Sequence, residues 1–245
     1  MAYAASMRAS RRRSDPRVYF TAAPVDRVEI PTLFGPDGVV EVLEEPPTLR
    51  PPTVGWDLWT LDAPHHVEGT KTFLTNGYRK RLALFTGGTL TFVGSCIEFL
   101  GWPRTPMQFV ADPALNGLGL TELTLNFTMT VAAVRDYMEP PPERLRVQGG
   151  FRDLKLASGA RVYLNADGPR VARAASHDLP VVELEWGDDF AEEAAYELVL
   201  QAQEWFGVDR ATLTFADHER RILDPGALRD HLTGSGLSAL AAGEA

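Results

Sequence analysis

The chain has 245 residues and a formal net charge of −9, with 44% hydrophobic and 23% charged residues. This composition is close to the globular average, so a large core can be buried, and no apolar run approaches the roughly 18 residues that a membrane span needs. An acidic chain is also a poor nucleic-acid surface, because affinity for phosphate comes from neutralising cations. We therefore expect a globular protein without a membrane segment, of one large or two small domains.

The first residues of the chain are basic. Arg8, Arg11, Arg12 and Arg13 outnumber the single acid of this stretch, Asp15. No apolar segment follows them, so they form no secretory signal, whereas an arginine- and serine-rich organelle transit peptide fits the composition and stays an alternative. A basic terminal segment can also contact nucleic acid or an acidic protein. These arginines are the candidate charge contact of the chain.

Prolines punctuate the chain up to about residue 53. Between them lie apolar pieces at residues 18–20, 25–30 and 39–43, each long enough for one short strand. A disordered linker is the alternative, but the apolar content is high for one. The sequence predicts an extended proline-rich arm over residues 1–53, which lies across another subunit.

Residues 54–180 are predicted to form a β-rich body. The first strands are expected at residues 78–85, 89–93 and 96–100, with a tight turn at Gly87-Gly88. Short strands at such spacing form a meander, the unit of β-sandwiches and barrels. Further strands are expected at residues 145–147, 154–156 and 161–164, with a break at Gly149-Gly150.

Residues 120–138 fit two patterns at once. Leu120, Leu123, Phe127, Val131 and Val134 follow a helical spacing, while alternate residues from 123 to 131 follow the period of a strand. Threonines fill the polar positions of the second pattern, and threonine favours strands. We predict a strand at 121–131 and a helical turn at 132–138, with helix as the alternative.

Residues 181–245 are predicted to form a small α+β part. A strand at 181–186 precedes a helix that begins with a capping box of Asp189 and Glu192 and ends at Gly207. One apolar stripe of that helix must be buried; its members are Phe190, Ala194, Leu198, Ala202 and Trp205. A strand at 211–215 and a helix from Asp224-Pro225 to Leu232 complete the chain.

The sequence offers no catalytic, cofactor or metal residue. His65-His66 is the one histidine cluster, and neighbouring strand residues point to opposite faces, so an exposed loop pair is expected rather than a metal site. His177, His218 and His231 lie among polar residues and are expected to be solvated. Cys96, the only cysteine, has no basic neighbour to activate it. A lone buried thiol indicates a reducing compartment, so the protein is expected in the cytoplasm or in a virion.

Together these observations predict a mainly β protein, a sandwich or barrel-like meander with a small α+β C-terminal part and an extended N-terminal arm. The expected function is that of a non-enzymatic structural subunit of a large assembly, such as a phage or viral particle component (capsid, tail or connector). Its partners would be copies of itself and other subunits, with nucleic acid reached only through the basic arm. A binding adaptor in a cellular, nucleic-acid-handling complex is the alternative, and an enzyme with an unrecognised site is the third.

Overall fold

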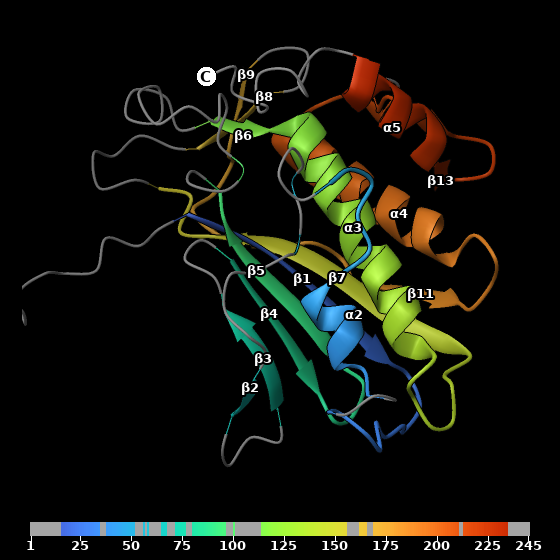
Figure 1. Ribbon diagram of the computed structural model, residues 1–245. Coiled ribbons are helices and arrows are strands. Elements are labelled where there is room, and N and C mark those ends of the chain that lie inside the picture. Colours follow the sequence, from blue (N-terminus) through green and yellow to red (C-terminus); the bar gives the residue numbers. More distant parts are fainter. Residues whose placement is uncertain are drawn as a thin grey trace, which may run out of the picture.

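The computed structural model describes residues 16–34, 38–51, 56, 58, 65–67, 72–76, 80–96, 100, 114–155, 162–165, 169–210 and 213–234. Its largest unit is an eight-stranded sheet in which all the pairings are antiparallel (Figure 1). The strands follow one another across the sheet as β10 (His177–Asp178), β7 (Arg144–Arg152), β1 (Arg17–Pro24), β5 (Leu90–Ser95), β4 (Lys80–Phe85), β3 (Thr72–Asn76) and β2 (His65–Val67). Strand β11 (Val182–Glu185) also pairs with β7.

The remaining elements are short strands and helices. The strands are β6 (Ala114–Asn116), β8 (Tyr163–Asn165) and β9 (Pro169–Val171) in a three-stranded sheet, and β12 (Ala216–Asp217) with β13 (Ile222–Leu223) in a hairpin. The helices are α2 (Val40–Glu44), α3 (Gly117–Arg135), α4 (Phe190–Phe206) and α5 (Pro225–Gly234). Within the described residues, no helix is both long enough and apolar enough to cross a membrane.

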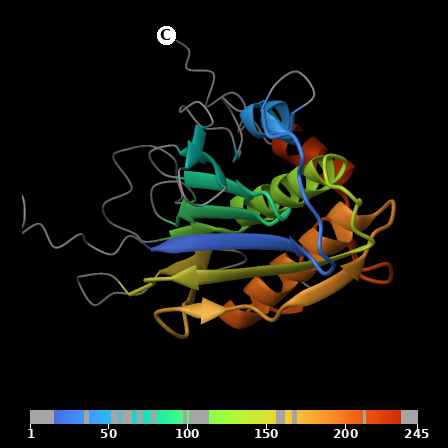
Figure 2. The same ribbon diagram turned by 90° about the horizontal axis from the view of Figure 1, so that it is seen from below.

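Helices α3 and α4 cover one face of the main sheet (Figures 1 and 2). Phe20 of β1 packs on Phe127 of α3 with ring centroids 5.4 Å apart, and Phe151 of β7 packs on Phe206 of α4 at 5.3 Å. The β-rich class is thus confirmed at this coarse level. The expected sandwich or barrel is not found, because the described strands form an open sheet whose second layer is helical.

The structure corrects the interpretation of the N-terminal arm. Strand β1, expected to lie on another subunit, occupies the interior of the chain's own sheet between β5 and β7. Its alternate side chains Val18, Phe20 and Ala22 are buried in the core. Pro16 precedes the paired segment and Pro24 is its last residue, so neither proline interrupts the ladder. Residues 1–15, with Arg8 and Arg11 to Arg13, lie outside the described residues.

The other two extended pieces of the predicted arm also differ. Residues 25–30 form no strand and contain one isolated bridge, from Glu29 to Glu139, while most of residues 39–43 lie in the short helix α2 in place of a strand. Val39 and Leu43 are buried in the main core. A helical turn brings residues four apart onto one side, so this conformation buries both side chains together.

Helix α3 replaces the strand predicted at residues 121–131. Its predicted helical stripe, which includes Leu123 and Phe127, faces the sheet. A second stripe, with Leu125 fully buried and Leu118 and Met129 partly buried, faces a separate core formed with α4 and α5. Because both stripes of this helix are apolar, their residues together alternate with polar residues along the sequence, as in a strand. The strand prediction was therefore wrong because the helix is covered on two sides.

The threonines of α3 are accommodated by bonds to their own helix. The Thr121, Thr124 and Thr130 hydroxyls donate to the carbonyl oxygens four residues earlier, at 2.7–3.0 Å. Asn116 caps the helix, since its side-chain oxygen accepts from the Gly119 backbone N–H at 3.0 Å. These bonds satisfy polar groups that would otherwise be buried without partners.

A buried ion pair fixes the segment near residue 50 onto α3. The Arg50 guanidinium donates to both carboxylate oxygens of Glu122, at 3.0 and 2.7 Å, and both side chains are almost fully buried. Asn126, one turn further along α3, accepts from the Leu49 backbone N–H and donates to the Trp56 carbonyl oxygen. The helix thus clamps this segment through side chains rather than through a strand ladder.

The predicted hairpin is confirmed in β4 and β5, where Gly88 adopts a φ of +79° in the turn. Cys96 and Leu100, expected in a further strand, lie in no strand, and residues 97–99 are outside the described part. The break predicted at Gly149-Gly150 is wrong, because β7 runs through both glycines. Neighbouring side chains lie so close to them that an added Cβ atom would be crowded, which explains the glycines within a strand.

The C-terminal elements mostly follow the prediction. Strand β11, helix α4 ending at Gly207 and helix α5 are confirmed. The apolar stripe of α4 is buried, except that Trp205 is partly exposed. Residues 213–215, expected in a strand, precede the actual strand β12, and residues 211–212 lie outside the described part.

The capping box at the start of α4 is not formed. The Asp189 side chain makes no cap hydrogen bond and instead accepts from the Arg220 guanidinium at 2.6 Å. A carboxylate near a helix N-terminus still interacts favourably with the helix dipole. The start of α4 is therefore tied to the β12–β13 hairpin rather than capped locally.

Candidate functional site

The face of the main sheet that points away from α3 and α4 is the candidate binding surface. Along β1 the side chains at even positions enter the core, so those at odd positions, such as Tyr19 and Thr21, lie on the opposite face. Figure 2 shows the helices behind the strands on this side and no described helix in front of them. We call this surface the open face; its charged residues are Arg17, Arg81, Arg144, Arg146, Arg152, Asp178, Glu183 and Glu185.

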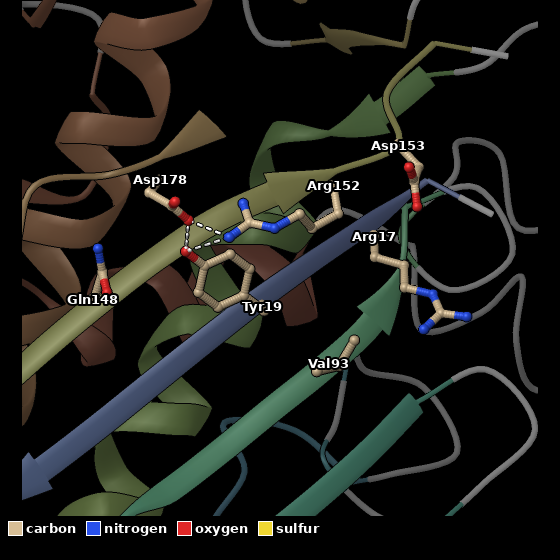
Figure 3. A pocket seen from close by; sticks show the side chains of 7 residues that line it. All are labelled: Arg17, Tyr19, Val93, Gln148, Arg152, Asp153 and Asp178. Atoms are coloured by element: carbon tan, nitrogen blue, oxygen red, sulfur yellow. Dashed lines mark hydrogen bonds and ion pairs between the residues drawn. The ribbon is translucent and has the colours of Figure 1, made fainter. Parts of the chain in front are cut away.

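A hollow of about 600 Å³ lies on the open face, near the end of β7. Strands β1, β5, β7 and β10 contribute most of its lining (Figure 3). The lining residues are Arg17, Tyr19, Val93, Gln148, Arg152, Asp153 and Asp178. The hollow therefore combines an aromatic and apolar floor with charged groups of both signs.

Two arginines stand directly opposite each other beside the hollow. Arg17 on β1 is the cross-strand partner of Arg152 on β7. Opposed residues of an antiparallel pair have Cβ atoms about 5 Å apart, and like charges in such positions destabilise the pair. Arg152 turns toward Asp178, whereas Arg17 turns the other way (Figure 3). Arg17 is exposed, and no hydrogen bond or ion pair joins its side chain to any other described residue.

Arg152 is held by several partners at once. Its guanidinium forms an ion pair with Asp178, contacts the Tyr19 hydroxyl at 3.4 Å and lies over the Tyr19 ring, 4.7 Å from the centroid. It also donates to the carbonyl oxygens of Phe151 and His177, at 2.9 and 3.4 Å. These contacts fix the position of Arg152, whereas Arg17 is the cation of the opposed pair that has no partner among the described residues.

Tyr19 and Asp178 share a hydrogen bond in which the phenol donates to the carboxylate. Burial raises the pKa of the Tyr19 phenol, and the Asp178 carboxylate raises it further. The hydrogen bonds from Tyr19 and Arg152 hold the pKa of Asp178 below its ordinary value. Asp178 is thus ionised at neutral pH, and it neutralises Arg152 but not Arg17.

Glycine shapes the floor of this cluster. Gly150 lies between Tyr19 and Asp178 in the sheet, and a Cβ atom there would come within 2.5 Å of the Tyr19 ring and 2.6 Å of the His177 carbonyl oxygen. The tyrosine ring therefore has space to cross over β7 and reach Asp178. At the rim, Asp153 has a φ of +56°, a conformation that is uncommon for a residue other than glycine.

Chemically, the hollow is suited to binding rather than to a recognisable reaction. Two guanidinium groups and a phenol line it, and such groups recognise oxyanions. None of the lining residues is a histidine or a cysteine. The part of the chain that the structure describes contains no group of three or more histidine, cysteine, aspartate or glutamate residues placed to hold a metal ion.

The histidines follow expectation only in part. The backbone of His65 and His66 forms strand β2 instead of an exposed loop, and their side chains lie outside the description. His177 stacks on Trp205 with ring centroids 4.8 Å apart, and the His218 Nδ1 atom lies 3.1 Å from the Tyr196 hydroxyl. Neither is a simply solvated side chain. His231 is exposed, as expected, and its ring centroid lies 5.0 Å from that of Phe215.

Of the other residues considered from the sequence, Cys96 is buried, as expected. Sequence reasoning did not find Tyr19, Arg152 or Asp178, which lie far apart in the chain and meet only through the strand register. The alternation of Arg17 and Tyr19 with buried residues was the one available signal.

Comparisons of the chain with protein-family models, with curated proteins and with solved structures find no match.

Proposed function

We propose that this protein is a non-enzymatic structural subunit of a large assembly, such as a capsid, tail or connector of a phage or viral particle. In this proposal it docks onto a second copy of itself through the open face of the sheet. The observation that carries the proposal is the opposition of Arg17 and Arg152, of which only Arg152 has an anionic partner among the described residues. The absence of catalysis rests on the sequence alone.

Charge complementarity supports a second copy as the occupant. Among the described residues the open face has five arginines and three acids, a net charge of about +2, while the whole chain has a net charge of −9. The remaining surface of a neighbouring copy is therefore acidic on balance, and it attracts an arginine-rich face. The basic segment with Arg8, Arg11, Arg12 and Arg13 precedes β1 directly in the sequence and would add to the same contact.

The same charge distribution favours one kind of symmetry. Two open faces would repel each other, so the open face of one copy should contact a different surface of the next copy. Such a heterologous contact generates a ring when its rotation closes and a filament when it does not. Rings and filaments are the forms that connector and tail subunits build, which is why this class of assembly fits the contact.

Sedimentation velocity of the purified chain over a series of salt concentrations tests this function. We expect oligomers at low salt that dissociate as salt rises, because exposed charges are screened over about 8 Å at physiological ionic strength. The variant Arg17→Glu/Arg81→Glu should remain monomeric at low salt. Arg170→Glu, an exposed arginine on β9 outside the main sheet, is the matched control and should assemble like the parent. A parent chain that is monomeric at every salt and protein concentration contradicts the proposal.

A further inference from the structure

The hollow on the open face contains an imbalance of charge that a bound group would relieve. Arg17 and Arg152 are direct cross-strand neighbours, and Asp178 compensates only Arg152. The Asp153 carboxylate at the rim makes no ion pair with Arg17 that the structure records. One cation of the opposed pair is therefore available to a ligand.

From this geometry we infer that the hollow is a carboxylate-binding site, which receives an aspartate or glutamate side chain of the docking partner. The inference rests on the proposed function, because the carboxylate is supplied by the neighbouring copy. A guanidinium matches the planar carboxylate in a bidentate geometry, and no described residue of the chain's own structure pairs with Arg17. Tyr19 and Val93 provide the apolar floor for the methylene groups of the incoming side chain.

Carboxylate fits the hollow better than phosphate does. The Asp178 carboxylate lies among the lining residues and stays ionised, so a doubly charged anion would meet more repulsion than a singly charged one. The acidic balance of the whole chain also disfavours a nucleic-acid phosphate, whose affinity depends on many neutralised charges. A single carboxylate needs only one free cation.

In this site Asp178 and Tyr19 are positioning residues. Both hold Arg152 against β7, and Asp178 neutralises its charge, so that the charge available to the ligand comes from Arg17. Asp178 therefore competes with the ligand for positive charge. Its removal should strengthen binding, whereas loss of a purely structural residue would weaken binding or leave it unchanged.

Titration of the isotope-labelled full chain followed by NMR tests the inference, under conditions where sedimentation shows a monomer. The probe is N-acetyl-glutamate N-methylamide, with the glutamine analogue as the neutral control. We expect shifts of the Tyr19 and Val93 backbone amides with the glutamate probe only. Arg17→Gln should weaken binding about tenfold, as expected when a charge-assisted hydrogen bond is lost. Asp178→Asn should tighten it about threefold, a modest gain because the site is exposed.

Arg144→Gln, which lies on the open face but pairs with Glu183, is the matched control and should bind the probe like the parent. Equal binding of both probes, or unchanged binding in Arg17→Gln, would overturn the inference. So would inorganic phosphate that binds at least tenfold more tightly than the glutamate probe. If the probe binds as expected but the chain never associates, the site stands and the docking proposal fails. If association depends on salt but the probe does not bind, the site fails alone.

Discussion

Gly88 in the β4–β5 turn shows how strongly one residue can be constrained. Its φ of +79° suits glycine, and an added Cβ atom would come within 2.7 Å of Val28, 2.9 Å of Pro24 and 3.0 Å of Met138. We expect Gly88→Ala to lower the free energy of unfolding by roughly 1–3 kcal/mol, because it combines backbone strain with crowding.

Gly87 supplies the matched control for this prediction. It has no atom within 4 Å of an added Cβ and lies exposed in the same turn. Gly87→Ala should therefore stay within about 0.5 kcal/mol of the parent or gain a little stability. Chemical denaturation of both variants measures the difference. Equal destabilisation by the two substitutions would mean that the surroundings of Gly88 and its positive φ do not disfavour a side chain there.

Glu193 near the start of α4 carries a pH-dependent cost. Burial raises its pKa, and the nearby Asp189, Glu197 and Glu192 carboxylates raise it further. An acid whose pKa is higher in the folded state destabilises that state once it is ionised, and the cost disappears when pH falls below the pKa of the unfolded chain.

Glu193→Gln should therefore raise the melting temperature at pH 7 and leave it nearly unchanged at a pH of about 3, where both states are protonated. Thermal melts monitored by circular dichroism at the two pH values test this. A lower melting temperature of the variant at pH 7 would show that the favourable helix-dipole interaction outweighs the repulsion.

At the scale of elements, the Arg50–Glu122 pair is the feature with the largest expected effect on stability. Glu122→Ala should cost about 3–5 kcal/mol, because it leaves a buried guanidinium without its countercharge. Replacement of both partners by apolar residues, as Arg50→Met/Glu122→Leu, should be much less harmful or neutral. Urea denaturation of the single and double variants distinguishes the two outcomes. A double variant as unstable as the single one would show that the clamp requires its charges.

Some elements could be predicted from the sequence because their signals are local. Helix α4, helix α5 and the β4–β5 hairpin are marked by glycine, proline and periodic apolar residues near one another in the chain. Helix α3 could not be separated from a strand, since two buried stripes produce both periods at once. Leu198 is buried as its stripe predicts, and its neighbour Glu197 forms an ion pair with Arg221, a contact that the stripe does not indicate.

The candidate site was beyond the reach of sequence reasoning for a related reason. Tyr19 and Asp178 are 159 positions apart, and they meet because β10 and β1 both pair with β7. Register between distant strands depends on the burial of one sheet face as a whole, which no local pattern specifies. The sequence could indicate that Arg17 and Tyr19 lie on the same side of a strand. It could not indicate which residues of other strands lie next to them.

At the scale of the whole molecule, strand β1 near the N-terminus is part of the main sheet and not of an arm that lies on another subunit. Removal of residues 1–24 would delete β1 from the interior of the sheet, together with the buried Val18 and Phe20, and we expect an unfolded chain. Removal of residues 1–15 leaves β1 intact and should keep the melting temperature within a few degrees of the parent. Circular dichroism and thermal melts of the two truncated chains test this. A folded product of the longer deletion would contradict the sheet order.

The central claim, that the open face is the docking surface, can be tested by thiol labelling. Cysteine at Thr21, on the open face, should react slowly with a maleimide in low-salt oligomers and quickly in the high-salt monomer, since docking covers it. The same cysteine in the Arg17→Glu/Arg81→Glu variant, which should stay monomeric, is the control for the effect of salt on the reaction itself, and the native Cys96 is buried. The labelling rate at position 21 should depend strongly on salt in the parent chain and much less in this variant. Labelling at position 21 that is equally fast in oligomer and monomer would contradict it.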